Sequence, residues 1–168
     1  MTQRSYVKKQ RSMWIKDVGI RLHIVGHKGV VGGATHELFK RLGYNVTGSD
    51  KGEKVLEADI YFVCVPEDYV EEVVLKLPLS QFITVRSSVT PGQCRKLLEG
   101  AGIHVCHNPE FLRECIAVQD EFSPARVVIG ECCKEHGDIL EDLYKPLRVP
   151  IVRTDLTTSE LVKMASNN

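Results

Sequence analysis

Residues 20–33 read IRLHIVGHKGVVGG, an apolar segment followed by a turn with four glycines. A strand that runs through such a turn into a helix is typical of a dinucleotide-binding βαβ unit with the fingerprint G-x-G-x-x-G. Gly29 and Gly32 match its second and third glycines, whereas Gly26 matches the first only if the turn has one extra residue. The helix N-terminus at Val30–Gly32 is predicted to offer its N–H groups to a pyrophosphate. A structural turn of another α/β protein remains the alternative at this point.

A carboxylate ends the second predicted strand. Asp50 follows residues 46–49 and lies 24 residues after Gly26. At this position a carboxylate accepts hydrogen bonds from both ribose hydroxyls of an adenosine and repels a 2′-phosphate. Lys51 and Lys54 weaken this preference slightly, but NAD is favoured over NADP.

Strand-like and helix-like segments alternate along the chain. The apolar run Asp59–Val65 (DIYFVCV) is typical of a strand covered on both faces. Further strands are expected at 20–25, 44–48, 82–85, 103–106, 126–129 and 151–152. Helices are expected at 31–42, 69–77, 91–101, 133–144 and from 157 onward, the last with Thr157 or Thr158 as N-cap and Glu160 in its first turn. This order predicts a Rossmann-like, doubly wound α/β fold, with a mainly parallel sheet and helices on both faces.

The length of 168 residues fits one domain with short flanking segments. Residues 1–19 are predicted to be a basic N-terminal extension, interpreted as solvated, with a polyanion-binding arm as the alternative. Residues 20–156 would form the dinucleotide-binding domain, and residues 157–168 would begin a longer helix.

Composition excludes several classes of protein. The 22 basic and 22 acidic residues cancel, which argues against a nucleic-acid-binding surface. No apolar run of 18 residues and no signal peptide is present, so no membrane association is expected. Six cysteines without a C-x-x-C pair indicate a reduced, cytoplasmic protein.

A metal site near the fifth predicted strand is a possibility raised by His104, Cys106, His107 and Cys115. Neighbouring positions of a strand point to opposite faces, so His104 and His107 cannot both face one ion without a bend. Structural roles are therefore favoured, and no metal is predicted.

Three later segments contain longer motifs. They are residues 85–92 (VRSSVTPG), residues 108–115 (NPEFLREC) with Ala117 and Asp120 after them, and residues 144–167, which contain E-L-x-K-x-x-x-N. These resemble V-K-S-T-V-P-P-G, N-P-E-F-L-x-E-G and the approach to the central helix in the UDP-glucose/GDP-mannose dehydrogenase family. The resemblance covers about residues 20–168.

This resemblance implies oxidation of the C6 hydroxyl of a nucleotide sugar to a carboxylate, with two hydride transfers to NAD and a covalent thiol adduct. Glu110 would handle the catalytic water, and Lys163 and Asn167 would stabilise the oxyanion from one helix face. The alternatives are that Glu110 caps the following helix and that Lys163 and Asn167 face solvent. The substrate would be lined by Phe111, Leu112 and Arg113.

The residues expected to bind NAD come from the turn, from Asp50 and from the resemblance. Ser88 takes the place of the family's threonine beside the nicotinamide. The full set is Gly26, Gly29, Val30, Val31, Gly32, Asp50, Val65, Pro66, Ser88 and Glu114.

Four features depart from the family pattern. The glycine turn has an extra residue, and the link 50–59 is short where the family has a helix-containing segment. Cys115 replaces a glycine, and Thr90 replaces a proline. The motif G-F-G-G-x-C, which carries the family's nucleophilic cysteine, does not occur in these 168 residues. Lys163 and Asn167 cannot replace a thiolate nucleophile, so a second domain or a partner chain is expected to complete the enzyme.

Two other functions remain open: a stand-alone NAD-binding module without chemistry, and a small oxidoreductase that resembles β-hydroxyacid dehydrogenases. The family's central helix builds a dimer, so the helix from 157 onward is expected to contact a second subunit or a partner chain. The residues predicted to make that contact are Leu161, Val162, Met164 and Ala165.

Overall fold

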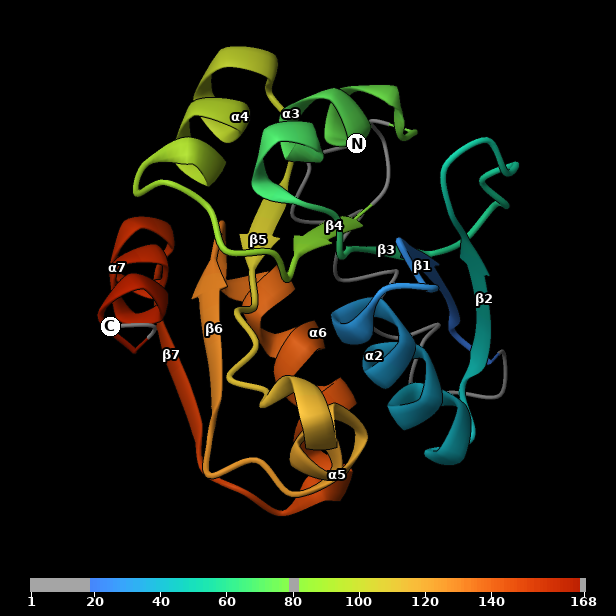
Figure 1. Cartoon of the computed structure of the whole chain (residues 1–168). Coiled ribbons are helices and arrows are strands. Elements are labelled where there is room, and N and C mark those ends of the chain that lie inside the picture. Colours follow the sequence, from blue (N-terminus) through green and yellow to red (C-terminus); the bar gives the residue numbers. More distant parts are fainter. Residues whose placement is uncertain (1–18, 79–81, 167–168) are drawn as a thin grey trace.

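A seven-stranded sheet forms the centre of the molecule in the computed structural model, which describes residues 19–78 and 82–166 (Figure 1). The strand order is β2-β1-β3-β4-β5-β6-β7, and all neighbours are parallel except β5 and β6. The strands are β1 (Arg21–Val25), β2 (Asn45–Ser49), β3 (Ile60–Val63), β4 (Phe82–Val85), β5 (Val105–His107), β6 (Val127–Glu131) and β7 (Ile151–Asp155). The basic extension and Asn167 lie outside the described residues.

Helices cover both faces of the sheet (Figure 1). They are α2 (Val30–Arg41), α3 (Glu67–Lys76), α4 (Gln93–Ala101), α5 (Ala117–Phe122), α6 (Lys134–Tyr144) and α7 (Leu156–Ser166), with 3-10 turns η1 (Glu114–Ile116) and η2 (Lys145–Leu147). α3, α4 and α7 share one apolar core with the sheet, and α2 and α6 share the other. Over the described ranges, none of these helices has the length and apolar character needed to cross a membrane.

β3 illustrates why the sheet is buried on both sides. All four of its residues are buried, with Ile60 and Phe62 in the core under α2 and Tyr61 and Val63 in the core under α3. Successive strand residues point to opposite faces, so a continuous apolar run needs a cover on each. The predicted doubly wound α/β fold is confirmed.

The chain changes winding direction between β1 and β3. β2 lies on one side of β1, and β3 begins the series on the other side. Ligands of doubly wound sheets bind at such a switch point, outside the carboxyl ends of the strands. The glycine turn after β1 therefore lies where a dinucleotide is expected.

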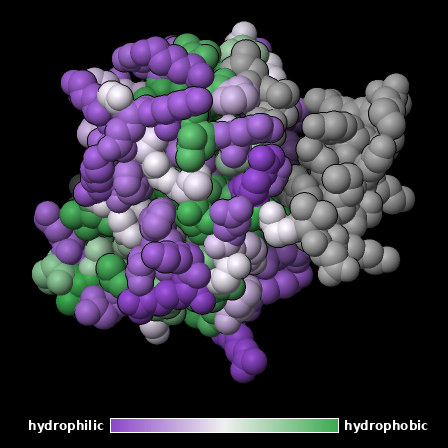
Figure 2. Space-filling model, turned by 90° about the vertical axis from the view of Figure 1, so that its right-hand side faces the viewer, coloured by the Kyte–Doolittle hydropathy of each residue, from purple (hydrophilic) through white to green (hydrophobic). Residues whose placement is uncertain are grey.

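The short link after Asp50 makes β2 the edge strand. Residues 50–59 contain no helix or strand, so the chain passes directly from β2 to β3. The face on this side of the molecule is mainly hydrophilic and carries apolar atoms in separate patches (Figure 2). Within the link itself, Val55 and Leu56 are 38% and 44% exposed.

The start of α7 differs from the prediction. Asp155, rather than Thr157 or Thr158, acts as N-cap, because its Oδ1 accepts the N–H of Thr158 at 3.1 Å. Pairing with β6 extends β7 as far as Asp155, which moves the helix start to Leu156. Glu160 accordingly lies beyond the first turn and is fully buried.

Candidate cofactor and substrate site

Two glycines of the turn are required by packing. Gly26 has a φ of 88° and donates its N–H to the carbonyl of Ser49 at 2.8 Å. A Cβ on Gly26 would lie 2.2 Å from the carbonyl oxygen of Cys64, and one on Gly32 would lie 2.1 Å from that of Gly26. Neither position can hold a side chain without moving backbone, so both glycines shape the turn.

Gly29 differs, because a Cβ there would meet only the Gly26 oxygen, at 3.4 Å. Gly29 is the exposed N-cap residue of α2, no side chain caps this helix end, and Val30 is 46% exposed. An uncapped helix N-terminus without a side chain in front of it suits the approach of a pyrophosphate. The turn accommodates its extra residue because the His27 ring lies over Gly48. A Cβ on Gly48 would lie 2.5 Å from Cγ of that ring.

The Asp50 carboxylate lies beside this turn at the end of β2. Oδ1 accepts the N–H of Lys51 at 2.8 Å and Oδ2 accepts the N–H of Lys28 at 3.3 Å. The Lys51 N–H bond is the main reason that the pKa of Asp50 lies below its usual value. The Lys28 ammonium forms an ion pair with Glu53, so the positive charge of Lys28 is already paired with a carboxylate. The arrangement suits ribose hydroxyls and disfavours a 2′-phosphate.

The segments that follow β3 and β4 are linked at the carboxyl edge of the sheet. The hydroxyl of Ser87 accepts the N–H of Val65 at 3.1 Å and donates to the Val65 carbonyl at 2.5 Å. This link places Val65, the exposed Pro66 and the half-buried Ser88 at the carboxyl edge of the sheet. The sequence analysis missed Ser87, although it stands beside Ser88 in the 85–92 motif.

Glu110 and Lys163, 53 residues apart in the chain, form an ion pair of 2.8 Å. Their side chains are 14% and 5% exposed. The alternative that Lys163 faces solvent is therefore wrong. Glu110 does not cap the following helix either, because residues 111–113 are not helical and its Oε2 accepts the N–H of Leu112 at 2.6 Å. Asn167 lies outside the described residues.

A pocket of about 330 Å³ opens beside this ion pair. Its lining includes Glu110 and the three predicted substrate residues Phe111, Leu112 and Arg113. The Phe111 ring lies 5.5 Å from Lys163 Nζ and 4.9 Å from the Arg126 guanidinium carbon. Glu114 is exposed on η1 and does not line this pocket.

A buried polar network supports the pocket floor. The Arg86 guanidinium lies 2.9 Å from Glu121 and donates to Asn108 Oδ1 at 2.9 Å, and Asn108 also accepts the Tyr144 hydroxyl at 2.6 Å. Burial raises the pKa of Glu121, and Arg86 opposes that shift. The network fixes the start of the 108–113 segment. The sequence analysis missed it because its members are distant in the chain.

Of the four residues considered for a metal, His104 and Cys106 both lie near Cys132, whereas His107 and Cys115 lie elsewhere. His107 is buried and bonds Ser159 Oγ at 2.8 Å and the Ser87 carbonyl at 3.2 Å, and burial lowers its pKa to about 4. Cys115 is exposed on η1. His104 instead lies near Cys132, Cys133 and His136, at the other end of the sheet.

A doubly wound sheet, an uncapped helix N-terminus after a glycine turn and a ribose-type carboxylate together define a dinucleotide-binding Rossmann domain. A sequence profile of the UDP-glucose/GDP-mannose dehydrogenase family, NAD binding domain, matches residues 46–148. The chain belongs to this family, and NAD is the cofactor of its domain.

The relatives include UDP-glucose 6-dehydrogenase of Rickettsia conorii, which is 42% identical over 118 residues. That match covers 67% of this chain and 27% of the relative. GDP-mannose 6-dehydrogenase of Pseudomonas aeruginosa is 31% identical over 147 residues, covering 71% of this chain and 34% of the relative. The chain thus spans about a quarter to a third of these relatives.

Solved structures share the fold. UDP-glucose dehydrogenase of Pyrobaculum islandicum superposes with a TM-score of 0.79 at 25% identity, over 89% of this chain and 49% of the other. A ternary complex of GDP-mannose dehydrogenase from Pseudomonas aeruginosa superposes with a TM-score of 0.76 at 25% identity, over 88% of this chain and 49% of the other.

Proposed function

We propose that this chain is the NAD-binding part of a nucleotide-sugar 6-dehydrogenase, which oxidises the C6 alcohol to a carboxylate once a second domain or a partner chain completes it. The observation that carries the proposal is the Glu110–Lys163 ion pair beside the pocket. Relatives named UDP-glucose and GDP-mannose 6-dehydrogenase support the substrate class.

Lys163 is suited to stabilise a developing oxyanion. Its ammonium is almost fully buried, and the Glu110 carboxylate holds it in place. A fixed charge shielded from water acts more strongly on reaction intermediates than a solvated one. Asn167, four residues further along the sequence, would add an amide donor.

Glu110 is suited to accept a proton from the catalytic water. One of its oxygens binds Lys163 and the other binds the Leu112 N–H, so the carboxylate has a defined orientation. When bound, NAD supplies the hydride acceptor. Arg126, whose guanidinium lies over Phe111, would contribute positive charge for the diphosphate of the substrate.

Residues of the turn, Asp50, Val65, Pro66 and Ser88 would bind NAD at the switch point. Glu114 is included in this set through the family motif alone. A cytoplasmic location is supported by six cysteines, none of which is in a disulfide.

A calorimetric titration of the purified chain with NAD⁺ and NADP⁺ tests the cofactor assignment. We expect saturable binding of NAD⁺, with at least about tenfold weaker binding of NADP⁺ and of NAD⁺ to Asp50→Ala. Equal binding by Asp50→Ala would contradict the assigned ribose site.

A complementation assay tests the chemistry. The chain is mixed with a separately produced second domain of a relative that contains G-F-G-G-x-C, and NADH formation is followed with UDP-glucose and with GDP-mannose. We expect turnover that Lys163→Met abolishes while NAD⁺ binding persists. NAD⁺ binding with no turnover in any mixture would favour the stand-alone binding module.

A further inference from the structure

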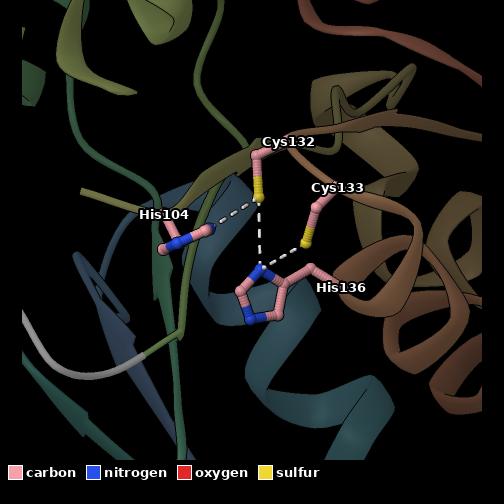
Figure 3. A group of neighbouring side chains, drawn as sticks. All are labelled: His104, Cys132, Cys133 and His136. Atoms are coloured by element: carbon pink, nitrogen blue, oxygen red, sulfur yellow. Dashed lines mark hydrogen bonds between the residues drawn. The ribbon is translucent and has the colours of Figure 1, made fainter. Parts of the chain in front are cut away.

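A second cluster of reactive side chains lies at the opposite end of the sheet from the glycine turn. His104 directly precedes β5, Cys132 and Cys133 connect β6 to α6, and His136 lies in the first turn of α6 (Figure 3). β5 and β6 are antiparallel with His107 opposite Gly130, and this register brings the start of β5 beside the end of β6. Residues nearly thirty positions apart in the chain thereby meet.

The four side chains point toward one another (Figure 3). Cys132 Sγ and Cys133 Sγ lie 3.2 and 3.3 Å from His136 Nδ1, and Cys132 Sγ lies 3.8 Å from His104 Nδ1. All four potential ligand atoms lie within 4.8 Å of one another.

These spacings match the edges of a tetrahedral zinc site. Bonds of about 2.3 Å to sulfur and about 2.0 Å to nitrogen imply S–N edges of about 3.5 Å and S–S edges of about 3.8 Å. The ligand atoms lie at most 4.8 Å apart, which is about 1 Å longer than the S–S edge. Small rotations of the side chains close this gap.

Hydrogen bonds alone do not account for this convergence. His136 Nδ1 carries either one hydrogen or one lone pair, yet two thiols approach it within 3.3 Å. A cation that replaces the thiol protons satisfies both sulfurs and both imidazoles at once.

Neighbouring groups fix the positions of the four side chains. Cys133 is the N-cap residue of α6, and the Cys133 side chain does not cap this helix end. The His136 ring stacks on Phe82 with centroids 4.2 Å apart, and the Cys106 thiol donates to Cys132 Sγ at 3.6 Å. Such contacts outside the ligand set orient metal ligands and tune their basicity.

We propose that His104, Cys132, Cys133 and His136 bind one Zn²⁺ ion in tetrahedral geometry. Two sulfur and two nitrogen ligands suit zinc better than calcium or magnesium, which prefer oxygen. A site filled by four protein ligands has a structural role, so the ion would hold β5, β6 and α6 together. Three of the ligands are partly exposed, which gives the ion an entry path.

Cobalt substitution tests the geometry directly. The full chain is treated with chelator, kept reduced with a phosphine and titrated with CoCl₂ under an inert atmosphere. We expect one equivalent to produce intense tetrahedral ligand-field bands and a thiolate-to-cobalt charge-transfer band, both removed by one equivalent of ZnCl₂. A weak six-coordinate spectrum without the charge-transfer band would overturn the proposal.

Variants assign the ligands. Cys133→Ser is expected to reduce the charge-transfer intensity by about half and His104→Asn to weaken cobalt binding at least about tenfold, because each removes one ligand. Cys115→Ser, at an exposed cysteine outside the cluster, is the matched control and should keep the full spectrum. An unchanged spectrum in Cys132→Ser/Cys133→Ser would contradict the site.

Thermal unfolding of the wild-type chain gives a second readout. Zinc at a free concentration a hundredfold above its dissociation constant should raise the melting temperature by about 5–10 °C. NAD⁺ binding should not depend on zinc, since the two sites lie at opposite ends of the sheet. The zinc result and the cofactor result can thus fail independently.

Discussion

Gly29 and Gly32 lie in the same turn but are glycines for different reasons. Gly32 has no room for a side chain, because its Cβ would lie 2.1 Å from a backbone oxygen. Gly29 has room and an ordinary φ of −75°. Gly32 is thus needed for folding, and Gly29 leaves space for a ligand.

We therefore expect Gly29→Ala to unfold like the wild type but to bind NAD⁺ at least about tenfold more weakly. Gly32→Ala should lose about 2–4 kcal/mol of unfolding free energy, since backbone must move. Urea unfolding and calorimetry of both variants separate the two effects. Normal NAD⁺ binding by Gly29→Ala would show that the pyrophosphate lies elsewhere.

His107 is expected to make stability depend on pH. Its pKa falls from 6.5 to about 4 because it is buried. Below pH 6.5 the His107 imidazole is protonated in the unfolded chain, whereas in the folded chain it is protonated only at about pH 4. The free energy of unfolding should therefore fall with decreasing pH, by about 2 kcal/mol between pH 7 and pH 5 from this residue.

Urea unfolding at pH 7 and pH 5, with chelator present, measures this effect. His107→Gln retains hydrogen-bonding groups but cannot titrate, so it should lose less stability over the same interval. Equal losses in the two proteins would refute the assignment to His107.

At the scale of elements, Glu160 connects two helices. Its buried carboxylate accepts the N–H of Gly92 at 2.5 Å and the N–H of Cys94 at 2.9 Å. α7 therefore caps the N-terminus of α4, where a negative charge is stabilised by the helix dipole. The sequence analysis placed Glu160 in the first turn of its own helix, because the distant partner cannot be read from local spacing.

Glu160→Ala should reduce the free energy of unfolding by about 2–4 kcal/mol, since it leaves two N–H groups without their partner and opens a cavity. Glu99→Ala, at an exposed position of α4, is the matched control and should cost less than about 0.5 kcal/mol. Urea unfolding measures both. A similar small loss in the two variants would show that the cap contributes little.

At the scale of the whole molecule, one side of α7 is uncovered. Leu161 and Met164 are 52% and 49% exposed, Ala165 is exposed, and Val162 is half-buried. The opposite side of the helix packs on the sheet through Leu156. The predicted contact of α7 with a second subunit or a partner chain remains a prediction.

Sedimentation velocity over a range of concentrations tests this contact. We expect a dimer whose dissociation constant rises at least about tenfold in Leu161→Glu, because the charge would be buried at the interface. A monomer at the highest concentration would leave a partner chain as the remaining occupant, to be tested by co-sedimentation with the separately produced second domain.

Local pattern and short-range spacing determined the doubly wound fold, the glycine turn and Asp50, because apolar periodicity and turn chemistry act over a few residues. The later motifs were sufficient to single out Glu110 and Lys163 as candidate site residues. Only the tertiary structure decided that these two form a buried ion pair, that Glu160 caps α4 and that His104 meets Cys132, Cys133 and His136. Each of these contacts joins residues distant in the chain, and they meet only because the strand order and register bring them together.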